Sequence, residues 1–163
     1  MMTEHLADFR FVLAEINAES PRGRVMVATA MIDDLLGRTI AARLVDAPEV
    51  GKLLEGFNAP LGSFSARVVA AYGLGGISKR EFDDLQIIRK IRNDFAHQTG
   101  ASFADDSMKD RAMLLTMAAQ DYREVVVNAE GRFTSAAVAL VLNLTNRPHY
   151  VAQKRLAHEP WRY

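Results

Sequence analysis

The 163-residue sequence contains no cysteine and no excess of either charge. Without cysteine the fold cannot depend on disulfide bonds, which indicates a reducing compartment. Lysine and arginine number 20, as do aspartate and glutamate, so the formal net charge is zero. A neutral molecule lacks the long-range positive field that draws proteins onto nucleic acid. We therefore expect weak or no direct binding to duplex DNA.

The sequence also lacks a long apolar run. Its longest aliphatic stretch, residues 136–142, is far shorter than the ~20 residues that span a bilayer. The N-terminus carries Glu4 where a secretory signal peptide carries bases, and no apolar segment follows it. Hydrophobic residues make up 49% and charged residues 25%, an ordinary globular composition. These features predict a cytoplasmic protein with one hydrophobic core and no membrane segment.

No stretch alternates strictly between apolar and polar residues, as a half-buried strand does. Apolar residues instead recur at the three- and four-residue spacing of helices. Glycine and proline divide the chain into about seven helical stretches. These are residues 6–20, 22–45, 50–57, 63–72, 79–98, 107–117 and 133–144. The sequence predicts an all-α protein, a single compact bundle with residues 22–45 as its central helix.

The predicted bundle domain covers residues 1–146, and residues 147–163 form a C-terminal tail. The helical period is lost after Arg147–Pro148, and the tail is basic and aromatic. Any local basic patch is expected there.

Within the bundle, residues 118–132 leave two alternatives open. Their β-branched valines favour an extended segment, but these valines are equally compatible with a longer preceding helix that ends at Gly131.

The clearest helix start lies at Ser78. Ser78 and Glu81 have the spacing of a capping box, in which each side chain bonds to the other residue's backbone N–H. Ile77 and Phe82 have the spacing of the hydrophobic staple that often accompanies such a box. We predict a helix over residues 79–98.

The best candidate site lies near the end of that helix. Arg89, Arg92, Asn93 and His97 share one side of the helical wheel, opposite an apolar side. An arginine can bind a phosphate through two hydrogen bonds, and a neutral histidine can abstract a proton near pH 7. A purely structural role is the alternative, because a cation and a histidine in the last turn of a helix also interact favourably with its dipole and cap its carbonyls.

Other acidic and basic residues add binding candidates without indicating a metal. Asp84 falls on the apolar side of the same helix, where an unpaired carboxylate is costly, so we expect Arg67 or Arg24 as its partner. Asp33 and Asp34 are adjacent on a helix, so their side chains point in different directions, and we interpret both as part of a solvent-exposed face. Arg89, Arg67 and Asp84 are the further binding candidates. The histidines show no metal-ligand spacing, and we predict no metal and no cofactor.

Three segments resemble the signature of the mannitol-operon-repressor (MltR-like) family. They are Pro60–Arg67, Ala71–Gly75 and Ile77–Asp84, and the resemblance extends over residues 24–98. It implies an all-helical fold and a transcriptional regulator of the repressor type. Because that family has no recognisable DNA-binding domain, the resemblance implies action through a protein partner.

A shorter resemblance concerns Arg92-Asn93-x-x-x-His97, which is similar to the motif of HEPN domains. Those helical bundles include metal-independent ribonucleases and toxin–antitoxin components, in which two protomers join their motifs over RNA. The resemblance implies catalytic roles for Arg92, Asn93 and His97 in a homodimer, and we expect a homodimer for the regulator as well. Regulator, ribonuclease and non-catalytic helical interaction module therefore remain as three hypotheses.

Overall fold

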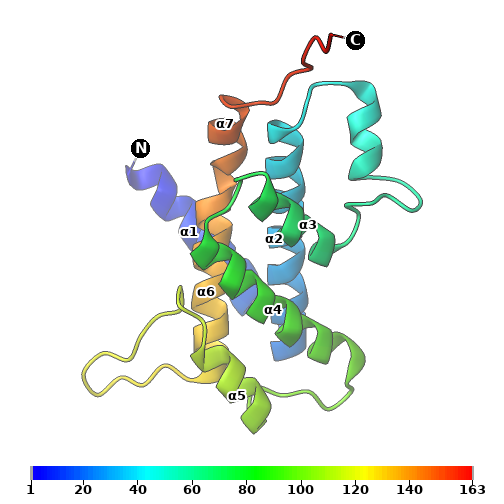
Figure 1. Cartoon of the computed structure of the whole chain (residues 1–163). Coiled ribbons are helices and arrows are strands. Elements are labelled where there is room, and N and C mark those ends of the chain that lie inside the picture. The colour runs from blue at the N-terminus through cyan, green and yellow to red at the C-terminus, as the bar shows by residue number, and fades with distance from the viewer. Residues whose placement is uncertain (1, 163) are drawn as a thin grey trace.

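The computed structural model describes the backbone of residues 2–162 and the side chains of residues 10–162. The described residues form seven α-helices and one 3-10 helix, with no strand among them (Figure 1). This confirms the predicted all-α class. The elements are α1 (Met2–Asn17), α2 (Pro21–Arg43), η1 (Pro48–Leu53), α3 (Phe64–Gly73), α4 (Lys79–His97), α5 (Asp106–Met113), α6 (Ala129–Thr145) and α7 (Arg147–Ala152).

The core forms where α2 and α6 run side by side and α4 crosses the bundle beside them (Figure 1). Fully buried apolar residues of α2 recur every four positions, as one helical stripe requires. They are Ala28, Ile32, Leu36 and Ile40, and none is more than 1% exposed. The prediction that α2 is the central helix is confirmed. Within the part of the chain that the structure describes, no helix is long and apolar enough to cross a membrane.

The start of α4 is built as its sequence predicts. Ser78 Oγ accepts a hydrogen bond from Glu81 N–H at 3.2 Å, and the Glu81 carboxylate accepts from Ser78 N–H at 2.7 Å. These bonds satisfy two donors that the first turn of a helix otherwise leaves unpaired. The capping box therefore fixes where α4 begins.

The C-terminal segment differs from its prediction, because Arg147–Ala152 forms α7. Proline near a helix start is favourable, since its missing N–H would have no intrahelical partner there, and Pro148 lies in the first turn of α7 instead of ending helical structure. Arg147 then reaches α4, where its guanidinium donates to Glu81 Oε1 at 2.7 Å and to the Gly76 carbonyl at 2.9 Å. The division of the chain after residue 146 itself stays a prediction.

The number of α-helices among the described residues agrees with the prediction, but α7 takes the place of the helix expected at residues 50–57. Residues 50–57 do not form an α-helix: the 3-10 helix η1 ends at Leu53, and Gly56 has a φ of 104°. Between α5 and α6 the chain is irregular, so the non-helical alternative holds for the valine-rich segment. Gly131 does not end a helix but lies in the first turn of α6, where the Asn128 side chain accepts its N–H at 2.8 Å.

Candidate functional site

The two sides of α4 separate as predicted. Its apolar side lies in the core, and its members are at most 1% exposed; they are Leu85, Ile88, Ile91 and Phe95. On the other side Arg89, Arg92 and Asn93 are half-buried, and His97 is exposed. The structure thus brings the four predicted site residues to one side of one helix, off the packed core.

These four residues make few bonds of their own. Arg92 Nη1 donates to the Asn93 side-chain oxygen at 3.2 Å, and Arg89 Nε donates to Gln86 at 3.1 Å. Among the described residues, neither arginine forms an ion pair and His97 makes no hydrogen bond. Their donors are therefore available to a ligand or to another protein chain.

The end of α4 is capped by a residue that the sequence analysis did not single out. Arg22, at the start of α2, donates to the carbonyls of Phe95, Gln98 and Thr99, the last two at 2.7 and 2.9 Å. The carbonyl-capping role proposed for His97 thus belongs to Arg22. No local pattern could have revealed it, since 73 residues separate Arg22 from Phe95.

Arg67 lies in an internal network. Its guanidinium donates to the carbonyls of Leu61 and Leu54 at 3.0 and 3.1 Å, and it pairs with the Asp33 carboxylate at 3.1 Å. Arg67 thereby joins α2 and α3 to the segment between η1 and α3. A ligand would have to compete with these bonds, and a binding role for Arg67 stays a prediction.

Asp33 is the acidic neighbour of this region. Its Oδ1 atom is buried and has no hydrogen-bond partner among the described residues. Burial raises the pKa of Asp33, although the charges of Arg67 and, more weakly, Arg92 oppose that effect. The prediction of a solvated face is therefore wrong for Asp33, whereas exposed Asp34 pairs with Arg38 at 2.8 Å on α2 as its spacing indicated.

Asp84 corrects another prediction, because among the described residues its carboxylate bonds to no arginine. Asp84 is fully buried, and its carboxylate accepts from Thr116 N–H at 3.0 Å, Thr116 Oγ1 at 3.1 Å and Met117 N–H at 2.8 Å. Arg24, the other arginine considered, pairs with Glu130 at 2.6 Å. Backbone N–H groups can satisfy a buried carboxylate as a cation does, and side-chain patterns do not encode them.

The arrangement offers an arginine for binding an anion and an exposed histidine for proton transfer. The nearby Asp33 carboxylate offsets part of the positive charge on this side of α4. Among the described residues, no group of three or more His, Cys, Asp or Glu could hold a metal ion. The polar side of α4 is thus suited to contacts with an acidic group or surface.

No protein-family model and no curated protein matches this chain. Among solved structures, it is similar to MtlR in the X-ray structure of the MtlR–HPr complex from Escherichia coli, with a TM-score of 0.64. The match covers 90% of this chain and 99% of that chain, at 21% sequence identity.

The chain has the MtlR fold. This agrees with the resemblance that the segments between residues 60 and 84 indicated. The match extends well beyond the residues 24–98 that carried the resemblance in the sequence. It concerns the fold, so the roles of Arg92, Asn93 and His97 stay predictions.

Proposed function

We propose that this protein is a cytoplasmic transcriptional regulator of the repressor type that acts by binding a protein partner. The observation that carries the proposal is the fold shared with MtlR, whose solved structure is a complex with the protein HPr. The zero net charge supports a protein partner over direct DNA binding.

The polar side of α4 is the surface we assign to this partner. Arg89 and Arg92 lie there without ion-pair partners among the described residues, and exposed Lys90 and His97 flank them. Charged groups at an interface steer the encounter and select partners by complementarity. An acidic patch on the partner fits this surface.

Calorimetric titration tests the proposal with the purified full chain. We expect binding to HPr from the same organism, and no nanomolar binding to duplex DNA at physiological salt. Arg89→Glu should weaken HPr binding about tenfold or more, because like charges then face each other. The matched control is Arg10→Glu, an equal charge change at an exposed position of α1. Absence of HPr binding, or nanomolar sequence-specific DNA binding with a steep salt dependence, would contradict the proposal.

A HEPN-type metal-independent ribonuclease is the second candidate. It is favoured by one observation: Arg92, Asn93 and His97 lie on one side of α4, off the core, and His97 has no structural bond among the described residues. Under this alternative, Arg92 binds phosphate and His97 assists attack by the ribose 2′-OH, in a homodimer that joins two motifs.

Cleavage of single-stranded RNA in the presence of a chelator tests this alternative. Arg92→Ala and His97→Ala should each reduce cleavage by about 10²–10⁴-fold while melting stays nearly unchanged. Intact RNA across a broad substrate panel would exclude the ribonuclease and leave the regulator. Cleavage that survives His97→Ala would exclude the site assignment.

A further inference from the structure

The loop between α5 and α6, residues 114–128, has a buried base and an exposed apolar tip. At the base, Leu115 and Ala118 are 1% and 7% exposed. At the tip, Tyr122, Val125 and Val126 are 66%, 66% and 76% exposed. In Figure 1 this loop extends away from the helices of the bundle. The tip therefore presents large apolar side chains to solvent in a part of the chain that is tied to the core.

Buried charged residues hold both ends of the loop. Asp84 of α4 accepts the N–H groups of Thr116 and Met117 near the start of the loop. Arg132 of α6, whose side chain is 5% exposed, donates to the Val127 carbonyl at 3.2 Å near its end. Buried charges with several bonds are costly to release. The loop is thus anchored from two helices.

The tip itself is also ordered by hydrogen bonds. Tyr122 and Val125 exchange two backbone bonds of 3.0 Å, which close a tight turn. The Asp121 carboxylate accepts from Val127 N–H at 2.8 Å and from Arg132 at 3.2 Å. A surface ordered in advance loses less conformational entropy on binding. This order makes the exposed tip a suitable interface and distinguishes it from a flexible loop.

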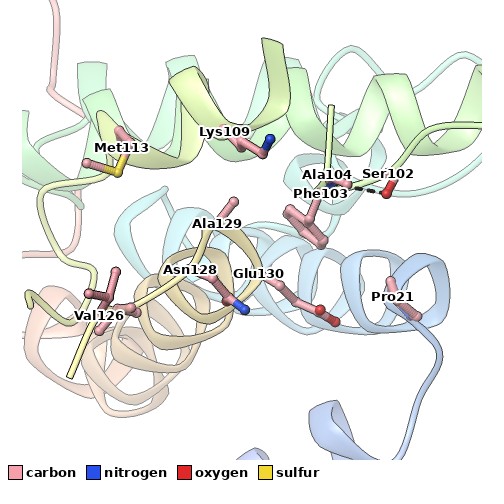
Figure 2. A pocket seen from close by; sticks show the side chains of 11 residues that line it. Pro21, Ser102, Phe103, Ala104, Lys109, Met113, Val126, Asn128, Ala129 and Glu130 are labelled. Carbon is pink, nitrogen blue, oxygen red and sulfur yellow. Dashed lines mark hydrogen bonds between the residues drawn. The ribbon is translucent and has the colours of Figure 1, made fainter. Parts of the chain in front are cut away.

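A hollow of about 640 Å³ adjoins the tip. Figure 2 shows it between α5 and the start of α6, with Val126 toward one end and Phe103 and Pro21 toward the other. Met113, which is 58% exposed, and Ala129 add apolar lining between these ends. A protruding apolar tip and an apolar hollow thus lie side by side on one face of the molecule.

We propose that the tip Tyr122–Val127 and the adjoining hollow form a two-fold interface between two copies of this chain. In a two-fold dimer the same patch occurs on both sides and must be complementary to itself. A protrusion beside a hollow meets that condition, because each copy's tip can pack into the other copy's hollow. This inference does not depend on the proposed regulatory function.

The charges around the patch favour a second copy over a partner selected by charge. Exposed Arg123 is next to exposed Glu124 at the tip, and Lys109 pairs with Asp106 at 3.3 Å on α5 beside the hollow. A patch of one sign would repel its own copy, whereas adjacent opposite charges let the patch face itself.

The backbone of the tip supports the same arrangement. Among the described residues, the N–H and carbonyl of Val126 make no hydrogen bond within the chain. Unpaired backbone N–H and C=O groups at an exposed edge are a template for pairing with another chain. The N–H and carbonyl of Val126 in one copy can therefore bond to the same groups of the other copy across the two-fold axis.

Light scattering of the full chain over a micromolar dilution series tests the interface. We expect a dimer, and Val126→Glu should raise its dissociation constant by about tenfold or more, because it places two like charges near the axis. Phe57→Glu is the matched control, since Phe57 is 98% exposed on the loop after η1. Both positions are exposed, so melting should stay unchanged. A monomeric wild type, or a Val126→Glu dimer as tight as wild type, would overturn the proposal.

The absence of cysteine permits a second test. A single thiol introduced by Val126→Cys should be joined efficiently to its copy by a short bis-maleimide, and one introduced by Phe57→Cys should not. Equal cross-linking of the two variants would place the interface elsewhere. If the wild type is monomeric and Val126→Glu abolishes HPr binding, the patch belongs to the partner and the dimer proposal is wrong.

Discussion

Replacement of Asp84 by alanine should destabilise the protein strongly, although Asp84 was first considered as a binding residue. Its carboxylate is fully buried and accepts three hydrogen bonds from Thr116 and Met117. The substitution leaves the N–H group of half-buried Met117 without this acceptor. It also releases the start of the α5–α6 loop from α4.

The expected loss follows from the energetics of bonds to charged groups. Each such bond contributes about 1.5–3 kcal/mol, and removal of the buried charge recovers part of the sum. Asp84→Ala leaves two backbone N–H groups and one hydroxyl without their acceptor, at about 1–3 kcal/mol for each buried donor, so we expect a loss of about 3–5 kcal/mol. For a chain of this size, that loss lowers the melting temperature by about 6–20 °C.

Urea unfolding at neutral pH measures the loss, with Asp83→Ala as the matched control. Asp83 is the adjacent aspartate on α4, but its side chain is 50% exposed and, within the described part of the chain, pairs with Lys79 alone. An exposed pair of this spacing contributes about 0.3–0.5 kcal/mol. Hydrogen exchange should show faster exchange at Thr116 and Met117 in Asp84→Ala alone. A loss below about 1 kcal/mol, or unchanged protection of these two amides, would refute the reasoning.

Two further predictions concern the ends of α4. Burial raises the pKa of Glu81, but hydrogen bonds from Arg147 and Ser78 outweigh burial and leave this pKa below its ordinary value of 4.5. A lowered folded-state pKa gives stability that is present above the unfolded pKa and lost as pH falls through the folded one. In the wild type, the free energy of unfolding should therefore fall as the pH is lowered from about 5 to 3, and Arg147→Met should make this fall less steep. An unchanged dependence of the unfolding free energy on pH would contradict this prediction. The second prediction concerns the cap at the other end of α4. In thermal melts, Arg22→Ala should lower the free energy of unfolding by about 1–2 kcal/mol because three carbonyls lose their donor, whereas His97→Ala should lower it by less than about 0.5 kcal/mol. A larger loss for His97→Ala than for Arg22→Ala would show that His97 caps the helix.

The features predicted correctly from sequence are those encoded within a few neighbouring residues. Ser78 and Glu81 lie three positions apart, and their side chains determine the start of α4 by themselves. The apolar side of the same helix is likewise a matter of spacing, so Leu85 and Phe95 were placed in the core correctly. The common side of Arg92 and His97 follows from the same helical period.

The features that sequence reasoning missed depend on residues brought together by the fold. Arg22 caps a helix 73 positions away, and nothing near Arg22 in the sequence indicates this. Asp84 was expected to need a cation, but a loop supplied backbone donors, which every residue except proline possesses. Pro148 was interpreted as the end of helical structure, although proline is equally suited to the first turn of a new helix.

The pairing of Glu81 with Arg147 has a consequence for how the chain is made. The two residues are 66 positions apart, so at about 5–20 residues per second a ribosome adds Arg147 about 3–13 s after Glu81. During that interval the capping box of α4 can form, but its carboxylate has no guanidinium to pair with in the site that later becomes buried. Newly made α4 should therefore stay loosely docked until α7 emerges. Nascent chains stalled before Arg147 should accordingly be more sensitive to proteases than chains stalled after α7 has left the ribosome.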